Sequence, residues 1–195
     1  MRFIVDGFPR QGNTTLAQLL TNVFPTVDVE FTHQHDIHYI NEELKKKSFI
    51  FSPVRNPVET LSSYLQMQKQ RHLESDNNEE IHFKIYTAMK NLEYFQEYLI
   101  KKIRIIKIID FKDVVNMSAD FSQGIIHKNR VINKVSIDFN IPVKSHLKLE
   151  NLFSEISDYS STKSSFFEAE ILKEQFKEKL TLLMDNHSFL TNKSY

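Results

Sequence analysis

The sequence predicts an α/β fold in which helices cover both faces of a central parallel sheet, giving three layers. Short apolar runs alternate with amphipathic segments of helical length, which is the pattern of strand–helix–strand units. The chain has 195 residues, which suits one domain, and it shows no internal repeat and no long linker. Residues 1–195 are therefore expected to form a single domain. A sequence that is 41% hydrophobic and contains 16 Phe can supply its core.

The first half of the chain is expected to alternate strands with helices. Residues 2–6 are a short apolar run ended by Gly7 and Pro9, which is typical of a buried strand. Residues 13–23 carry apolar side chains at helical spacing, with two threonines near the start of the segment. The next elements are expected at 27–33 (strand), 36–47 (helix) and 48–54 (strand).

The second half is expected to be mainly helical. Pro57 favours the first turn of a helix, and a polar loop follows at 74–80. The β-branched run at 103–109 predicts another strand, which Asp110 ends. Residues 144–165 are polar and weakly patterned. Further helices are expected at 80–101, about 125–139 and 167–185.

Composition argues against several classes of protein. Lys plus Arg and Asp plus Glu number 25 each, and zero net charge argues against a general nucleic-acid binder. The absence of cysteine excludes disulfides, thiolate nucleophiles and cysteine-ligated metal sites. No apolar run approaches the ~20 residues that cross a bilayer. The first residues run directly into a strand, so we expect no signal peptide, no membrane span and a cytoplasmic location.

Residues 6–20, DGFPRQGNTTLAQLL, have the outline of a phosphate-binding loop between a strand and a helix. The first-turn N–H groups of such a helix converge on an anion, and the helix dipole adds to the attraction. The lysine that usually follows the second glycine is replaced by Asn13, which cannot neutralise phosphate charge. The anion would then carry less charge, or Arg10 would grip it. The alternative is a tight turn capped by Asn13 or Thr14.

This loop resembles the 5′-phosphosulfate loop of sulfotransferases, which use 3′-phosphoadenosine 5′-phosphosulfate (PAPS) and commonly lack that lysine. The resemblance implies a P-loop NTPase-like fold and transfer of a sulfuryl group to a hydroxyl or amine of a small-molecule or carbohydrate acceptor. Gln11 lies in the same loop, at a position where serine is usual. The residues that match the family pattern are Pro9, Arg10, Gly12, Asn13, Thr14 and Thr15. The resemblance implies that Arg10, Gly12, Asn13, Thr14 and Thr15 hold the 5′-phosphosulfate, and Gln11 is counted with them among the nucleotide-binding residues.

A second stretch, PVRNPVETLSSYLQM at 53–67, resembles the 3′-phosphate motif of the same family. Arg55-Asn56-Pro57 follows a strand, and Ser63 stands eight residues after Arg55, as in the family pattern. Ligands of open α/β sheets collect at the carboxyl ends of strands, and a guanidinium can donate two parallel hydrogen bonds to a phosphate. The alternative is that Arg55 pairs with Glu59 and that Ser63 faces solvent.

The stretch EFTHQHDIH at 30–38 provides candidates for a catalytic base. Thr32-His33 resembles a Thr-His element of the family, whose histidine takes the proton of the acceptor hydroxyl. A histidine pKa near ~6.5 suits that role at neutral pH. His35 and Glu30 remain alternatives. His33, His35 and His38 could in principle bind zinc, but no partner cluster is visible, and we expect no metal.

The later motifs leave other functions open. The run IRIIKIIDFKDV at 103–114 loosely resembles a later strand of the family, but Asp110 could instead order magnesium in a small-molecule kinase or other P-loop NTPase. The Arg-Lys-Gly stretch with which many sulfotransferases contact the nucleotide again is missing, and Lys163 is the nearest basic candidate. A non-catalytic nucleotide-binding module is a third possibility.

Overall fold

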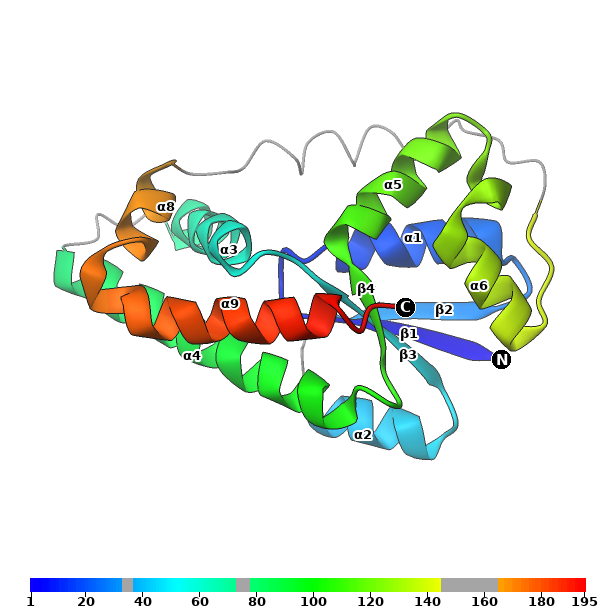
Figure 1. The fold of residues 1–195 in the computed structure, drawn as a ribbon, viewed down its shortest axis with the longest axis horizontal. Helices are drawn as coiled ribbons and strands as arrows, with labels where there is room; N and C mark the ends of the chain where they lie inside the picture. Colours follow the sequence, from blue (N-terminus) through cyan, green and yellow to red (C-terminus); the bar gives the residue numbers. More distant parts are fainter. Residues whose placement is uncertain (33–36, 73–77, 145–164) are drawn as a thin grey trace.

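The computed structural model describes residues 1–32, 37–72, 78–144 and 165–195. It has an α/β architecture around a sheet of four parallel strands in the order β2-β1-β3-β4 (Figure 1). The strands are β1 (Arg2–Asp6), β2 (Asp28–Thr32), β3 (Phe49–Val54) and β4 (Lys107–Asp110). Because all four strands run the same way, their carboxyl ends lie along one edge of the sheet.

Helices cover both faces of this sheet, as a three-layer arrangement requires. Figure 1 shows α1, α5 and α6 on one side and α2, α4 and α9 on the other, with α3 and α8 beyond the carboxyl edge of the strands. The α-helices are α1 (Asn13–Val23), α2 (Ile37–Lys45), α3 (Pro57–His72), α4 (Asn78–Lys102), α5 (Phe111–Ser122), α6 (Arg130–Phe139), α8 (Ser165–Ile171) and α9 (Lys177–Thr191). Two short 3-10 turns are η1 (Ile126–Lys128) and η2 (Glu174–Phe176).

The core is divided by the sheet into two apolar clusters. Side chains alternate between the faces of a strand, so Phe3 and Val5 of β1 join the cluster under α1, α5 and α6. Ile4 of the same strand and Ile50 of β3 join the cluster under α2, α4 and α9. Both clusters are buried, which explains why the central strands are continuous apolar runs and do not alternate with polar residues.

Most elements of the first half confirm the sequence prediction, whereas several of the second half correct it. The predicted strand at 103–109 begins only at Lys107. Residues 103–105 instead form a turn after α4, in which the N–H groups of Ile105 and Ile106 both donate to the Lys102 carbonyl, at 2.8 and 2.9 Å. The β-branched run therefore contains the turn that follows a long helix as well as a strand.

The helices near the carboxyl terminus also differ from the prediction. The α5 helix was not predicted, and α6 begins at Arg130, after the separate turn η1. The predicted helix at 167–185 is divided into α8, η2 and α9, because Lys173 has an extended backbone. The predicted polar loop at 74–80 is partly wrong, because α4 already begins at Asn78.

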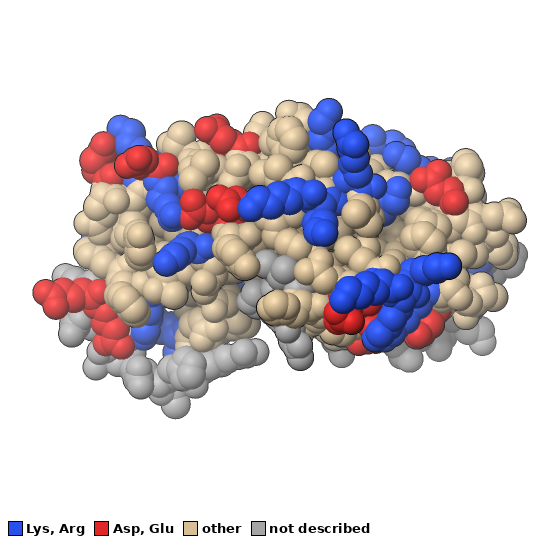
Figure 2. All heavy atoms as spheres, turned by 90° about the horizontal axis from the view of Figure 1, so that it is seen from below, with Lys and Arg blue, Asp and Glu red and all other residues tan. Residues whose placement is uncertain are grey.

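Charged residues of opposite sign lie close together on the surface. Figure 2 shows one face, on which Lys and Arg side chains form a broken band with Asp and Glu beside them. Lys45 lies 2.6 Å from Glu42, and Lys101 lies 3.8 Å from Glu97. Surface pairs of this kind contribute little to stability. None of the described helices is long and apolar enough to span a bilayer.

Tyr195 packs against β4, which is an edge strand. Its backbone N–H donates to the carbonyl of Ile108 at 2.7 Å, and its hydroxyl donates to Asp138. The ammonium groups of Lys107 and Lys134 lie 4.8 and 4.4 Å from the centre of its ring. Burial and the Asp138 hydrogen bond raise the pKa of the Tyr195 hydroxyl, so it remains a donor at neutral pH.

A buried carboxylate ties α2 to the amino-terminal edge of the sheet. The side chain of Glu43 is only 1% exposed, and it accepts hydrogen bonds from Arg2 (3.1 Å), Lys46 (2.8 Å) and Ser48 (2.9 Å). The hydrogen bond from Lys46 is the main cause of a lowered Glu43 pKa, and Ser48 and Arg2 add to it against the opposing effect of burial. The carboxylate is therefore stabilised in its charged form.

The Glu43→Gln variant is expected to lose about 1.5–3 kcal/mol of unfolding free energy at pH 7, because charge-assisted hydrogen bonds are lost. A carboxyl whose pKa is lower in the folded state stabilises above its unfolded pKa, and that contribution disappears as pH falls through the folded pKa. The gap between wild type and variant should therefore close on acidification, as measured by urea unfolding between pH 7 and pH 3. Glu42→Gln, at an exposed neighbour, should change stability much less; an equal loss in both variants would contradict this account.

Candidate anion-binding site

The loop between β1 and α1 is tight and is stabilised by an internal side-chain hydrogen bond. Gly12 has φ 92° and Arg10 has φ 70°, so two of its residues adopt the left-handed conformation. The side chain of Asn13 is buried, and its Nδ2 donates to the Gly7 carbonyl at 2.8 Å. A Cβ on Gly7 would lie 2.5 Å from Asn13 Oδ1. Asn13 therefore braces the loop with its amide nitrogen.

The first turn of α1, like that of α9, has no side-chain cap hydrogen bond. A side-chain oxygen caps α5 from Asp110 and α6 from Asn129, whereas Gly12, at the same position before α1, makes no side-chain cap hydrogen bond. The N–H groups at the start of a helix lack intrahelical partners and carry the positive end of its dipole. Gly12 has no side chain that could cap the helix, so the N–H groups of this first turn are not blocked by a side-chain cap.

Three further loop residues predicted to hold the ligand are placed around this helix start. Gln11 is buried, and its Oε1 has no hydrogen-bond partner among the described residues. Thr14 and Thr15 are half-buried in the first turn of α1. A buried acceptor such as Gln11 Oε1 favours a ligand that offers a donor as well as an anion.

The second motif joins the end of β3 to the start of α3. Asn56 Oδ1 accepts from the backbone N–H groups of Val58 (3.0 Å) and Glu59 (3.4 Å), and Pro57 occupies the first turn. Asparagine is a preferred helix cap, and proline is favoured in a first turn. The Asn-Pro pair thus ends the strand and begins the helix, which leaves Arg55 at the carboxyl edge of the sheet.

The two motifs contact each other through their charged and polar groups. Arg10 Nε donates to Ser63 Oγ at 2.9 Å, across 53 positions in the sequence. Arg55 Nη1 makes a longer contact of 3.4 Å to the Arg10 carbonyl. Ser63 is only 2% exposed, so it does not face solvent. The ion pair between Arg55 and Glu59 is present, with Nε 3.0 Å from the carboxylate.

Phe111 is a member of the site that the sequence did not reveal. Its ring lies 4.6 Å below the guanidinium carbon of Arg55, a distance that allows a cation–π interaction. A Cβ on Gly12 would lie 2.9 Å from the same ring. Phe111 is the first residue of α5, which begins directly after β4, so only the position of a helix that was not predicted brings it here.

Two carboxylates accompany the two guanidinium groups. Glu59 neutralises part of the Arg55 charge, and Asp6 is fully buried at the end of β1. The negative charge of Asp6 also acts on Tyr98 of α4. Burial is the main cause, and the Asp6 charge the second, of a Tyr98 pKa raised to about 12. The positive character of the site therefore depends on Arg10, Arg55 and the first-turn amides of α1.

The predicted base and the last basic contact lie outside the described residues; these are His33, His35 and Lys163. The register of the sheet pairs Thr32, at the end of β2, with Asp6, just before the loop. Glu30 accepts hydrogen bonds from Arg2 and from the Tyr39 hydroxyl (2.8 Å). The Tyr39 bond first and the Arg2 bond second lower the Glu30 pKa, which makes this carboxylate a weak base.

The described residues also bear on the magnesium interpretation. Asp110 Oδ1 accepts from the backbone N–H of Lys112 at 2.9 Å, so this carboxylate serves as the cap of α5. Within the described part of the chain, no group of three or more histidines or carboxylates is arranged to hold a metal ion. His38 lies exposed on α2.

Comparisons with known proteins identified no similar protein. No protein-family model matches the chain, and no curated protein and no solved structure matches it.

Proposed function

We propose that this site binds PAPS and that the chain is a sulfotransferase with a P-loop-like fold. The observation that carries the proposal is the contact between the two motifs: Arg10 donates to Ser63, and Arg55 reaches the Arg10 carbonyl. Two stretches that resemble opposite ends of one ligand site are adjacent at the carboxyl edge of β1 and β3.

The residues at this edge fit the two anionic groups of the nucleotide. Arg10 and the uncapped first turn of α1, including Thr14 and Thr15, would hold the 5′-phosphosulfate. Arg55 and Ser63 would hold the 3′-phosphate, for which a guanidinium and a hydroxyl are suitable donors. Gly12 lets the Phe111 ring pack directly against the loop, because a Cβ there would lie 2.9 Å from that ring.

The bound donor would supply a sulfuryl group, whose bond to the 5′-phosphate breaks as the acceptor oxygen or nitrogen bonds to sulfur. Arg10 and the loop amides would stabilise the charge that develops during this transfer. His33 would take the proton of the acceptor, with His35 as the nearest alternative. Glu30 is less suited, because Arg2 and Tyr39 already hold its carboxylate.

The site offers less support for ATP with magnesium. Asn13, at the position of the usual lysine, donates to the loop backbone and carries no charge. Asp110, at the position considered for ordering magnesium, caps a helix. A non-catalytic nucleotide-binding module would use the same contacts as the sulfotransferase, so only the absence of sulfate transfer would distinguish it.

Thermal unfolding with adenosine 3′,5′-bisphosphate tests the proposal. At 100 times its dissociation constant, a ligand stabilises the folded state by roughly 2.7 kcal/mol. We expect this nucleotide to stabilise the wild type without metal and ATP–magnesium to have a smaller effect. Arg55→Ala should weaken its binding by about 10- to 150-fold, corresponding to a charge-assisted hydrogen bond of about 1.5–3 kcal/mol.

Two variants separate phosphate binding from loss of structure. Glu59→Gln removes the ion-pair partner of Arg55 but keeps the guanidinium, so nucleotide binding should survive. Arg130→Ala removes an arginine whose side chain is exposed on α6, and it should behave like the wild type. Undiminished nucleotide binding by Arg55→Ala would refute the assignment of the 3′-phosphate, and selective stabilisation by ATP–magnesium would favour the kinase interpretation.

A further inference from the structure

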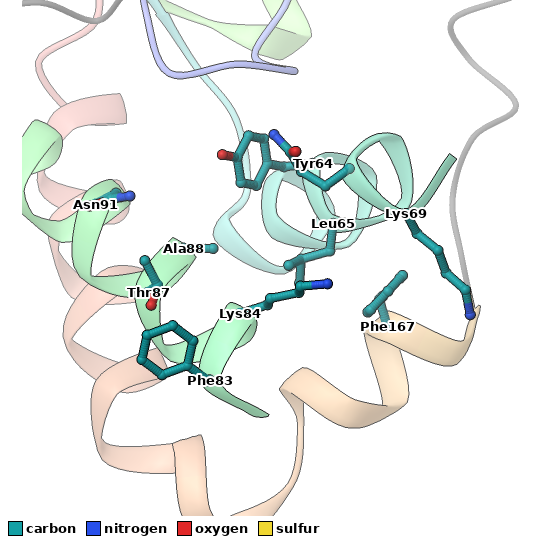
Figure 3. Close-up of a pocket in the computed structure, with 10 residues that line it drawn as sticks. Tyr64, Leu65, Lys69, Phe83, Lys84, Thr87, Ala88, Asn91 and Phe167 are labelled. Carbon is teal, nitrogen blue, oxygen red and sulfur yellow. The ribbon is translucent and has the colours of Figure 1, made fainter. Parts of the chain in front are cut away.

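A cavity of about 270 Å³ lies between α3, α4 and α8, in the helical region beyond the carboxyl edge of the sheet (Figure 3). Leu65 of α3, Ala88 of α4 and Phe167 of α8 provide buried apolar walls. Tyr64 and Phe83 add two more aromatic rings, and Phe83 is largely exposed at the rim. Three helices thus enclose an aromatic-lined space that opens to solvent.

The charged side chains that line this cavity are basic. Its described lining contains Lys69 and Lys84 but no Asp or Glu, although the whole chain is neutral. Figure 3 shows the Lys84 side chain extending beneath Leu65, across the space between α4 and α3. Lys84 pairs with Glu80, 3.3 Å away, but this carboxylate is not part of the lining. Lys84 therefore offers an anion an ammonium group beside the cavity, and the ammonium of Lys69 lies at its α8 side, 5.4 Å from the centre of the Phe166 ring.

From these features we propose that the cavity binds a small aromatic carboxylate, at a site separate from the one proposed for PAPS. The ring would pack among Tyr64, Phe83 and Phe167, where aromatic pairs add to the free energy of burial. The carboxylate would lie at Lys69 and Lys84. The volume is just below the ~300–1,000 Å³ of pockets that take drug-sized ligands, which favours one ring and a short chain.

Tyr64 connects the lining of the cavity to the loop between β1 and α1. The Tyr64 ring lies 5.3 Å from that of Phe8, a residue of the loop, and Tyr64 follows Ser63 in α3. A ligand packed against Tyr64 would therefore touch the residue next to the Arg10 partner. The proposal depends on the cavity and its lysines, and it does not require the nucleotide assignment to be correct.

Isothermal titration calorimetry with 3-phenylpropionate tests the site, and 3-phenylpropanol serves as the uncharged counterpart. We expect the wild type to bind the carboxylate and to bind the alcohol at least fivefold more weakly. Lys69→Met and Lys84→Met keep an apolar side chain but remove the charge, and each should weaken carboxylate binding about fivefold, the upper value for a partly exposed ion pair. Ala88→Met should fill the cavity and abolish binding of both compounds.

Lys90→Met is the matched control, because Lys90 is exposed on α4 but does not line the cavity. Its affinity for 3-phenylpropionate should equal that of the wild type, and both Lys69→Met and Lys84→Met should keep wild-type binding of adenosine 3′,5′-bisphosphate. The proposal is overturned if the wild type releases no heat at millimolar 3-phenylpropionate, if the alcohol binds as tightly, or if Lys84→Met and Lys90→Met bind equally.

Discussion

The Gly12→Ala variant is expected to lose about 2–5 kcal/mol of unfolding free energy. Two effects add: a left-handed backbone costs a non-glycine residue about 1–2 kcal/mol, and forcing an atom into a packed site costs about 1–3 kcal/mol. Gly12 has φ 92°, and its added Cβ would lie 2.9 and 3.0 Å from two atoms of the Phe111 ring. Urea unfolding monitored by circular dichroism measures the loss.

The same substitution should also impair nucleotide binding, because Phe111 must move to admit the methyl group. The ring contacts the guanidinium of Arg55, so its displacement would move the group assigned to the 3′-phosphate. Even at nucleotide concentrations that saturate the wild type, we expect little stabilisation of Gly12→Ala. Titration with adenosine 3′,5′-bisphosphate, at a temperature where the variant remains folded, checks this result.

Gly124→Ala provides the matched control for backbone strain. Gly124 also has a left-handed backbone, with φ 70°, but a Cβ there would meet no atom within 4 Å. Gly124→Ala should therefore lose about 1–2 kcal/mol of unfolding free energy, which is the cost of the left-handed backbone alone. Equal losses at positions 12 and 124 would show that the contact with Phe111 contributes nothing, and normal nucleotide binding by Gly12→Ala would contradict the proposed link to Arg55.

A second large loss of stability is expected from Phe3→Ala, in β1. Phe3 is fully buried, and its ring lies 4.9 Å from that of Phe51 and 5.2 Å from that of Phe139. Phe24 and Phe49 approach it edge-on at 6.4 and 6.2 Å. Truncation of a buried phenylalanine typically costs about 3–5 kcal/mol, because transfer free energy is lost and a cavity remains.

Chemical unfolding in urea measures this effect as a lower midpoint with an unchanged slope. Phe189→Ala is the control, because its ring is about half exposed on α9. That change should cost less than about 1 kcal/mol, since little apolar surface would be returned to water. A loss below about 2 kcal/mol for Phe3→Ala would mean that its neighbours collapse into the space, contrary to the close packing of this cluster.

Local sequence signals were sufficient for the strands and helices that carry the two motifs. β1 and α1 occupy the predicted residues, because an apolar run, a glycine-containing loop and helically spaced leucines all act within a few positions. The eight-residue spacing between Arg55 and Ser63 predicted that both face one ligand. In the structure, both residues contact Arg10. The parallel sheet then followed from the alternation of elements.

The elements and site contacts that the sequence did not predict depend on contacts between distant parts of the chain. The run at 103–109 has high strand propensity, but its first residues close the long helix α4, whose apolar face packs against α9. The contacts of Phe111 depend on the tertiary position of α5, which no motif encodes. The pairing of Glu59 with Arg55 is local, four residues apart, and the sequence offered it as an alternative. The roles of His33 and Lys163, and the sulfotransferase activity itself, stay predictions.

Tyr195 covers part of the exposed backbone of the edge strand β4. The outer side of an edge strand carries open peptide groups that can pair with a strand of another copy and so begin aggregation. At β4, the Ile108 carbonyl already accepts from the Tyr195 N–H, and two lysines stand beside the ring. A neighbouring strand would have to displace this residue and bring its backbone against positive charge. The contact thus protects β4 from self-association.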